Sequence, residues 1–185
     1  LAAYMAKNKF LYNSREGLQH IHWLAERHEY MLTKASLQLG KELGNAEWMS
    51  KTKYPEGWLP IDTYSKSVDN IVSPIYEYDW ESLRKEIIAN GGIHNAVLST
   101  SVPGESSSLV SNSTNSLYPI RQAIVVKTGA NSKNVFMAPE YNKYKDYYQY
   151  ERDKKNKRTT YKIRDALKLL NITVKKRPYG KKKKK

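Results

Sequence analysis

Apolar residues recur every three or four positions between residues 14 and 43, and this regularity limits the folds open to the chain. Such spacing places the residues on one face of a helix. Ser14 is a partial N-terminal cap, because Gly17 stands where Glu or Gln would complete a capping box. Gly44-Asn45 favours a helix end. We therefore predict one long helix, whose apolar stripe is formed by Leu18, Ile21, Ala25, His28, Leu32, Ala35 and Leu39, widened by Leu24 and Met31.

The next stretch, residues 45–78, is rich in Pro, Gly, Tyr and Trp, and its prolines interrupt any long element. It predicts a structured loop with short helical turns. Asp79 then caps a second helix, which Asn90-Gly91-Gly92 ends. The buried face of this helix is predicted to consist of Trp80, Leu83, Ile87 and Ile88.

The second half of the chain mixes strand and helix signals. Residues 96–101 predict a short strand, followed by a turn at 102–104 and a short helix over 105–112. Two further strands, 124–127 and 135–137, are predicted to form a hairpin around Gly129-Ala130-Asn131. A tyrosine-rich segment (141–150) and a short amphipathic helix (161–170) follow.

The charge of the chain is concentrated at one end. The formal net charge is +14, but residues 151–185 hold 16 Lys/Arg and 3 Asp/Glu, whereas residues 1–150 hold 16 and 15. The first 150 residues are therefore nearly neutral, and the high pI says little about them. There is no apolar run of the roughly 20 residues that span a bilayer, and no signal peptide is visible. We expect a cytoplasmic protein without a membrane partner.

The turn and helix start at residues 103–108 are the strongest candidate site. The first turn of a helix has unpaired backbone N–H groups and a positive dipole end, which favour anions. Gly104 lets an anion approach the backbone, and three serine hydroxyls follow it. The pattern predicts phosphate binding, although serine-rich helix starts are also common as ordinary caps.

A wider set of residues resembles, in order and spacing, the large chain of class I ribonucleotide reductases over residues 1 to about 150. The family reads P-S-E-T-S-S followed by S-N-x-T-N at the candidate loop, and G-x-L-P-I-D-T-Y upstream, where this chain has residues 57–64. Lys34-Ala35-Ser36 also match. The other matching residues are Asp79-Trp80-Glu81, Leu83-Arg84, Gly92, Asn95, Leu98, Pro103, Glu105, Ser107-Ser108, Ser111-Asn112, Thr114-Asn115, Pro119 and Arg121.

The resemblance implies a ten-stranded α/β barrel, of which this chain would be an incomplete part. We expect exposed strand edges and an exposed stripe on the long helix, and hence association with another chain. In the family, the candidate loop binds the diphosphate of the substrate ribonucleotide. Gly104 and Ser106 depart from the family's usual Ser and Thr, but keep an amide and a hydroxyl. The implied phosphate-binding residues are Pro103, Gly104, Glu105, Ser106, Ser107 and Ser108.

The resemblance also implies partners. The family reduces ribonucleoside diphosphates with cysteines, and this chain has none. It would therefore not be catalytic alone, and would need the remaining large-chain segments and the small subunit, which carries a dimetal-radical cofactor. No cofactor is expected in this chain itself. Tyr147-Tyr148 follow the loop too soon to match the family's radical-transfer pair, so they predict aromatic packing.

The histidines and acids outside the loop do not form a site pattern. His20, His22 and His28 are two and six residues apart, which does not place two metal ligands on one helix face. We expect His28 to be a hydrogen-bonded core residue. Asp79, Glu81 and Glu105 read as caps and surface charges.

Two alternatives to a reductase part remain open. The chain could be a non-functional gene fragment, an idea that fits the absence of Met at position 1 and the five terminal lysines, and cooperative unfolding would test it. It could instead be a basic module whose residues 151–185 bind nucleic acid. A solvated, partly helical or disordered extension is the simpler interpretation of those residues. The sequence favours a division into 1–150 and 151–185.

Overall fold

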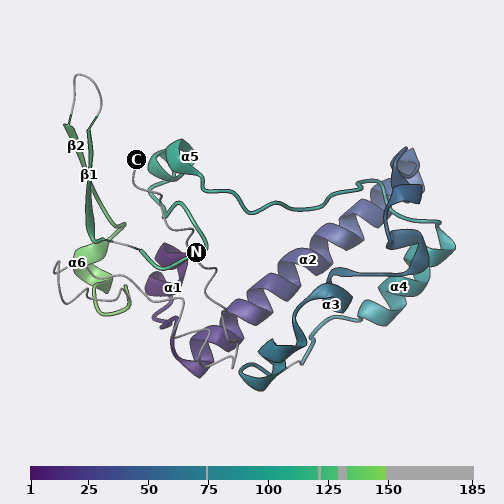
Figure 1. Cartoon of the computed structure of the whole chain (residues 1–185), viewed down its shortest axis with the longest axis horizontal. Coiled ribbons are helices and arrows are strands. Elements are labelled where there is room, and N and C mark those ends of the chain that lie inside the picture. The colour runs from purple at the N-terminus through teal and green to yellow at the C-terminus, as the bar shows by residue number, and fades with distance from the viewer. Residues whose placement is uncertain (74, 121, 129–132, 149–185) are drawn as a thin grey trace, which may run out of the picture.

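A single long helix, α2, organises the chain in the computed structural model (Figure 1). The structure describes residues 1–73, 75–120, 122–128 and 133–148. The helices and 3-10 turns in chain order are α1 (Ala2–Lys7), α2 (Arg15–Leu43), η1 (Met49–Lys51), η2 (Tyr54–Glu56), α3 (Pro60–Thr63), η3 (Lys66–Asn70), α4 (Trp80–Ala89), α5 (Glu105–Val110) and α6 (Tyr141–Tyr144); the strands are β1 (Ile124–Thr128) and β2 (Lys133–Met137).

The predicted ends of α2 are confirmed. The side chain of Ser14 accepts a hydrogen bond of 2.9 Å from the backbone N–H of Gly17. A Cβ atom at position 17 would lie 1.9 Å from the carbonyl oxygen of Leu11, so glycine is required where the chain turns into the helix. Gly44 ends the helix with φ of +90°, which a residue with a side chain rarely adopts.

The packed face of α2 is polar and built from small residues. Gly17, Glu26, Thr33, Ser36, Leu37 and Gly40 are buried. Residues 94 and 95 approach this face closely enough for the N–H of His94 to donate to the carbonyl of Ser36, and that of Asn95 to the Ser36 hydroxyl, each at 2.9 Å. A Cβ atom at Gly40 would lie 2.7 Å from the amide oxygen of Asn45 and 3.1 Å from the backbone nitrogen of His94. Small residues therefore let the chain backbone lie directly against the helix.

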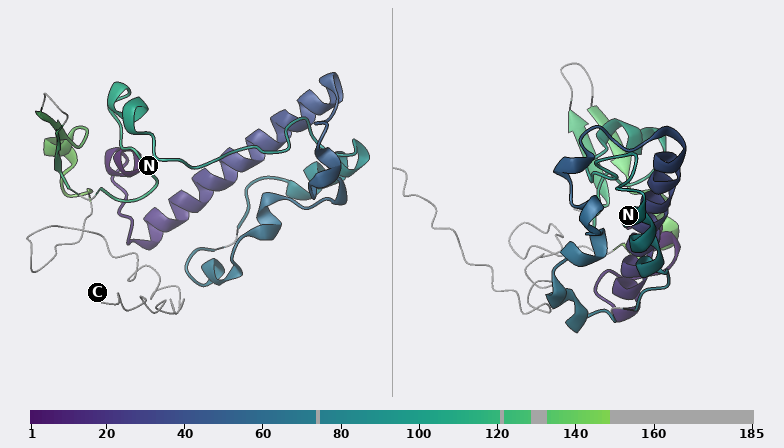
Figure 2. Two further views of the ribbon diagram at one scale, coloured as in Figure 1. Left: turned by 45° about the horizontal axis from the view of Figure 1, so that its top comes forward. Right: turned by 90° about the vertical axis from the view of Figure 1, so that its right-hand side faces the viewer.

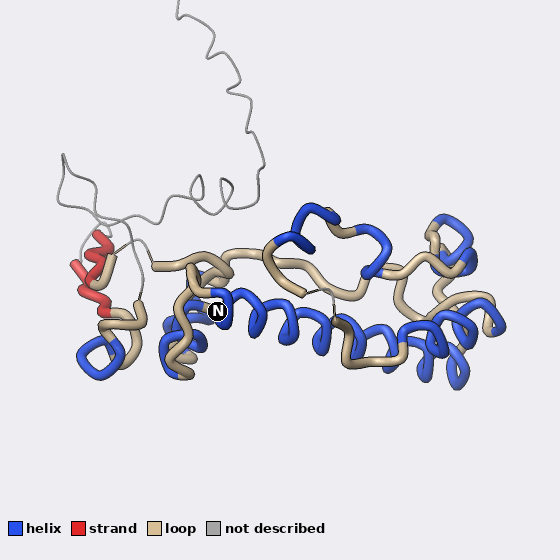
Figure 3. Tube along the Cα trace, turned by 90° about the horizontal axis from the view of Figure 1, so that it is seen from below, coloured by secondary structure: helices blue, strands red, loops and turns tan. Residues whose placement is uncertain are grey.

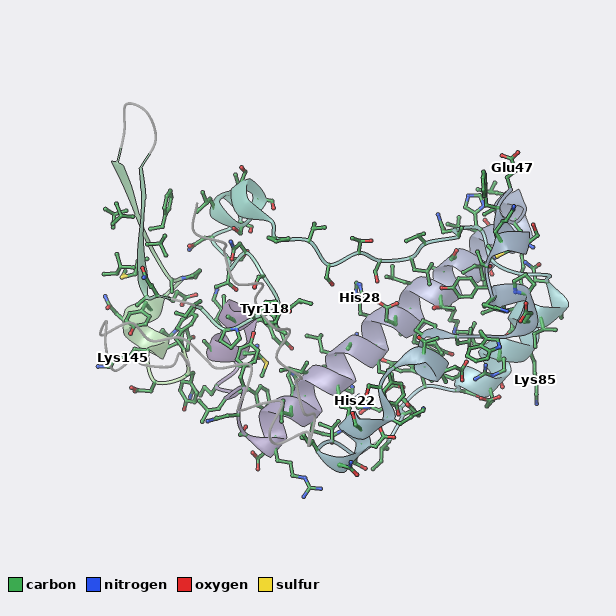
Figure 4. All side chains as sticks on the ribbon, viewed as in Figure 1. His22, His28, Glu47, Lys85, Tyr118 and Lys145 are labelled. Carbon is green, nitrogen blue, oxygen red and sulfur yellow. The ribbon has the colours of Figure 1, made fainter. Side chains whose placement is uncertain are left out.

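The predicted apolar stripe of α2 largely faces outward. Ala25, His28, Ala35 and Leu39 are exposed, which confirms the expectation of an uncovered stripe. The prediction that His28 is a core residue is wrong, because its side of the helix faces away from the segments that pack on α2. Figure 4 shows His22 and His28 on opposite sides of α2.

The main apolar core lies where α4 packs beside the second half of α2. It consists of Leu37, Met49, Leu59, Trp80, Leu83, Ile87 and Ile93. Asp79 caps α4 as predicted, accepting from the N–H of Ser82 at 2.9 Å. Ile88, which was expected in the buried face, is 48% exposed. It covers Gly57 at the edge of the core, where a Cβ atom would lie 2.8 Å from the Ile88 side chain.

Residues 45–78 form a loop with short turns, as predicted, and a buried carboxylate fixes its end to α2. Glu26 is only 6% exposed. It accepts hydrogen bonds from the backbone N–H groups of Glu77 and Tyr78 at 3.0 and 3.2 Å, and from the indole N–H of Trp80 at 3.2 Å. A buried carboxylate is stable only when such donors compensate for lost hydration.

The predicted strand at 96–101 and the turn at 102–104 are not formed. The segment runs as extended chain from the α4 end of the molecule to α5 and contacts α2 where Ser99 donates to Glu29 at 2.7 Å. A strand requires a neighbour to share its ladder of hydrogen bonds, and no described strand lies beside this segment. Figure 1 shows it crossing the open side of α2.

The predicted hairpin is confirmed by an antiparallel pair of strands. Ile124 is paired with Met137, and Val126 with Val135. These four side chains lie on one face of the hairpin and are at least half exposed. The residues at its tip, 129–131, lie outside the described residues, as does the amphipathic helix expected at 161–170. Figure 3 shows the hairpin at the opposite end of the molecule from α4.

A second apolar cluster joins the two ends of the described chain. It consists of Ala2, Ala3, Met5, Ala6, Tyr12 and Tyr148. The hydroxyl of Tyr148 donates to the carbonyl of Pro139 at 2.7 Å, and its ring lies 5.8 Å from that of Tyr141. Aromatic packing at Tyr148 is thus confirmed. Figure 2 shows α1 of this cluster at the start of α2. In the described part, no helix is long and apolar enough to cross a membrane.

The role of Glu26 predicts a large loss of stability on its removal. Glu26→Ala would leave three donors without an acceptor, two of them backbone groups of one segment. Each such group costs roughly 1–3 kcal/mol, so we expect the free energy of unfolding to fall by about 3 kcal/mol or more. Urea unfolding measures this. Glu42→Ala, an exposed glutamate on the same helix, is the matched control and should change stability by less than about 0.5 kcal/mol. Equal losses in both variants would contradict the assignment.

Candidate anion-binding loop

The six predicted site residues are contiguous: Pro103 and Gly104 precede α5, and Glu105 to Ser108 lie within its first turn. Gly104 is the N-cap residue, and its N–H donates to the carbonyl of Asn115 at 3.0 Å. Its own carbonyl accepts from the N–H of Ser108 at 3.1 Å, which closes the first helical turn. The first N–H groups of a helix are not used by its own ladder. The loop therefore presents the amides of Glu105, Ser106 and Ser107 at the start of α5.

The three serines of the loop lie in different environments. Ser106 and Ser107 are exposed, whereas Ser108 is 8% exposed and buried. The carbonyl of Ser108 accepts from the N–H of Ser113 at 2.8 Å, and the Ser111 hydroxyl donates to the carbonyl of Ser107 at 2.9 Å. Two serine hydroxyls are thus available to a ligand, and the third side chain packs inside the turn.

Position 104 is one of the two departures from the family pattern, and the local structure accounts for the glycine there. A Cβ atom there would lie 2.7 Å from the hydroxyl oxygen of Ser107. With glycine, the Ser107 hydroxyl can lie over the cap of α5. With serine at 104, the Ser107 side chain would have to rotate, and as the end of a flexible side chain it could do so at little cost.

The segment that follows α5 is fixed by hydrogen bonds to α1 and to Tyr12. The N–H of Ala3 donates to the hydroxyl of Thr114 at 3.1 Å, and the Tyr12 hydroxyl donates to the carbonyl of Leu117 at 3.1 Å. Burial raises the pKa of the Tyr12 hydroxyl, so it remains a donor. These contacts span more than one hundred residues of sequence, and sequence patterns gave no signal for them.

The residues that resemble G-x-L-P-I-D-T-Y have a structural role and lie on the α3–α4 side of the molecule, away from α5 (Figure 1). Asp62 accepts from the N–H of Leu59 at 2.8 Å and from both terminal nitrogens of Arg84 at 2.8 and 3.1 Å. Arg84 also donates to the carbonyl of Gly57. The hydrogen bond from Arg84 lowers the pKa of Asp62. This paired network fixes residues 57–62 on α4.

A chain of hydroxyl groups lies beneath the first half of α2, and sequence analysis did not anticipate it. Tyr76 donates to the hydroxyl of Tyr64 at 2.9 Å, and Tyr64 donates to Asp69 at 2.8 Å. Burial raises the pKa of both hydroxyls, so both stay protonated and the chain is a structural tie. The His22 ring lies 5.9 Å from that of Tyr76.

The histidines are placed individually, and the described residues contain no group of three His, Cys, Asp or Glu side chains that could hold a metal ion. His20 stacks on Phe10, with ring centroids 4.2 Å apart, and its Nε2 lies 3.0 Å from the Tyr4 hydroxyl. Asp79 is a cap as predicted. Glu81 is an exposed ion-pair partner of Arg84 at 3.1 Å.

Comparison with known families identifies the class of protein. Residues 1–179 match the family described as the ribonucleotide reductase barrel domain. The chain therefore belongs to this family, whose description implies an α/β barrel. The described residues hold one two-stranded sheet, so the complete ten-stranded barrel stays a prediction.

Individual relatives narrow the class to the large subunit. The chain is 38% identical over 148 residues to ribonucleoside-diphosphate reductase subunit alpha of Haemophilus influenzae, and 41% identical over 149 residues to that of Enterobacteria phage T4. Ribonucleoside-diphosphate reductase 1 subunit alpha of Escherichia coli is 38% identical over 148 residues. Each alignment covers 80% of this chain and 19% of the relative. The chain is thus a class I large-subunit sequence that spans about a fifth of the length of the curated relatives it matches.

The boundary near residue 150 stays a prediction. The pairwise alignments cover 148 or 149 residues, whereas the family match continues to residue 179. The greater part of residues 151–185 is thus inside the family match.

The Asp62–Arg84 pair predicts a pH-dependent contribution to stability. Because the folded-state pKa of Asp62 is lowered, its contribution is present above the unfolded-state value of about 4 and is lost as the pH falls through the folded value. Asp62→Asn should lower the free energy of unfolding at pH 7 by roughly 1 kcal/mol, as expected for a partly exposed pair. Urea unfolding from pH 7 to pH 3 should show this difference shrinking. The exposed Asp146→Asn is the control, and a difference for Asp62→Asn that is constant with pH would contradict the prediction.

Proposed function

We propose that this chain supplies the substrate-diphosphate-binding loop of a ribonucleoside-diphosphate reductase, for the reduction of ribonucleotides to deoxyribonucleotides. The observation that carries the proposal is the placement of Pro103 to Ser108 at the start of a helix, with Ser106 and Ser107 exposed, in a member of the large-subunit family. The relatives are named as ribonucleoside-diphosphate reductases, which favours a nucleoside diphosphate as the ligand.

The chemistry of the loop supports phosphate rather than a neutral ligand. Its donors are the backbone amides of residues 105–107 and the hydroxyls of Ser106 and Ser107. Hydrogen bonds from amides and hydroxyls to a charged oxygen are stronger than those between neutral groups. The helix start adds a favourable dipole. Gly104 leaves the backbone open to an oxygen at van der Waals distance, since no Cβ projects from the cap.

The proposed role requires partners. The sequence has no cysteine, so the thiol chemistry of reduction would come from other large-chain segments. The radical would come from the small subunit with its dimetal cofactor. The exposed stripe of α2 and the exposed apolar face of the hairpin support association with those segments, because apolar surfaces of this extent are normally covered. They would complete the ten-stranded barrel in the cytoplasm.

Removing the two exposed hydroxyls should weaken nucleotide binding. In the assembled large subunit, Ser106→Ala with Ser107→Ala removes two hydrogen bonds to charged oxygen, each worth roughly 1.5–3 kcal/mol. We expect the Kd for a ribonucleoside diphosphate to rise at least tenfold, measured by calorimetry. Ser82→Ala with Ser65→Ala, away from the loop, is the matched control. Unchanged affinity in the loop variant would refute the proposed site.

A second candidate function is nucleic-acid binding through residues 151–185, favoured by the 16 Lys/Arg and 3 Asp/Glu of that segment. Phosphate contacts by these cations would release counterions and make the affinity fall steeply with salt. Removing 151–185 should then abolish salt-sensitive binding of duplex DNA, as measured by fluorescence anisotropy between 50 and 200 mM salt. Retention of that binding by residues 1–150, which are nearly neutral, would rule the candidate out.

A further inference from the structure

A groove lies between the start of α2 and the segment that precedes α4. Phe10, Glu16, His20 and Trp23 line one side, and Ile75 and Glu77 line the other. Paired hydrogen bonds hold its floor, because the Gln19 side chain accepts from the N–H of Ser73 at 2.9 Å and donates to its carbonyl at 3.3 Å. The groove is therefore a defined feature of the fold.

The wall of the groove is aromatic. The His20 ring stacks on Phe10, with centroids 4.2 Å apart, and the tilted Trp23 ring lies 5.3 Å from it. The indole N–H of Trp23 donates to the Glu77 carboxylate at 2.5 Å, which fixes the ring. The Arg27 guanidinium lies 5.5 Å from the centroid of the Trp23 ring, so a cation already occupies part of this aromatic surface.

The charge of the groove is acidic at its rim. The side chains of Glu16 and Glu77 are exposed, and no Lys or Arg is among the described residues that line the groove. Ile75 is 68% exposed. Carboxylates at the rim, ring faces in the wall and an exposed aliphatic side chain suit a Lys or Arg side chain, whose apolar stem and charged end need both kinds of surface.

We propose that this groove is the docking site for the basic segment of the same chain, residues 151–185, beginning with its first cluster of cations. That cluster has five Lys or Arg residues between Arg152 and Arg158. The described chain ends at Tyr148, which is buried in the cluster that includes Tyr12. Phe10, a wall of the groove, packs against that same cluster.

Only a few residues join the basic segment to the described chain, so weak contacts with the groove are sufficient for docking. An extended chain spans roughly 3.3 Å per residue, so the four to ten residues after Tyr148 reach about 13–33 Å. A short link between two binding groups gives an effective concentration in the millimolar range. Each exposed ion pair contributes little, but two carboxylates and an aromatic wall then hold the segment for a substantial fraction of the time.

Introduced cysteines test the docking in the full chain, which has no cysteine of its own. Ser73→Cys with Lys155→Cys should form an intramolecular disulfide at least tenfold faster than Lys85→Cys with Lys155→Cys, which places the partner on α4. Ser73 contributes only backbone groups to its bonds with Gln19, so its substitution leaves the groove intact. A pair at Ser36 and Asn95, whose side chains are 3.0 Å apart, reports that α2 is folded.

Removing the carboxylate charges of the groove tests whether Glu16 and Glu77 contact the basic segment. Glu16→Gln with Glu77→Gln should slow closure of the Ser73–Lys155 pair at least threefold, as should 1 M salt, whereas Glu42→Gln with Glu47→Gln should not. Equal rates for the groove and α4 pairs would overturn the proposal. So would disulfides that form between chains in proportion to concentration, because a second copy would then be the occupant. Failure of the Ser36–Asn95 pair to close would overturn it too, since the groove would not exist in the free chain.

Discussion

The described structure depends on close backbone packing against a polar face of α2. Small residues at Ser36 and Gly40 admit residues 94 and 95 to within hydrogen-bond distance, and Glu26 accepts hydrogen bonds from residues 77, 78 and 80. Both attachments use backbone groups, which must be satisfied wherever they are buried. The segment between them, which contains α4, is thereby fixed at both ends, and α4 packs into the apolar core beside the second half of α2.

The sequence predicts helix ends better than helix faces. Ser14, Gly44 and Asp79 cap by contacts within a few residues, so their roles are visible locally. The buried face of α2 is not visible locally. The apolar period marks a surface that could be covered, whereas the buried residues of α2 are glycines, a serine, a threonine, a glutamate and Leu37, which lies outside the predicted stripe. Residues 96–101 do not form the predicted strand for a related reason. A strand requires a neighbouring strand that shares its hydrogen bonds, and a local pattern does not show whether such a neighbour is present.

The candidate site likewise has features that the sequence predicts and features that it does not. Residues 103–108 are contiguous, so the loop could be predicted from sequence as a single feature. Its supports at Thr114 and Leu117 pack on α1 and Tyr12 across more than one hundred residues, and no local pattern encodes that contact. The Asp62–Arg84 network was only partly predictable from the sequence. Both residues match the family pattern, but the hydrogen bonds between them are seen only in the fold.

The two proposed interactions of α2 are compatible because they use different faces. A helix turns about 100° per residue, so Glu16, His20 and Trp23 point roughly opposite to the stripe that contains Ala25, His28 and Leu39. The stripe is open to further barrel segments, while the groove is open to residues 151–185. The basic segment can therefore dock without covering the surface that completes the barrel.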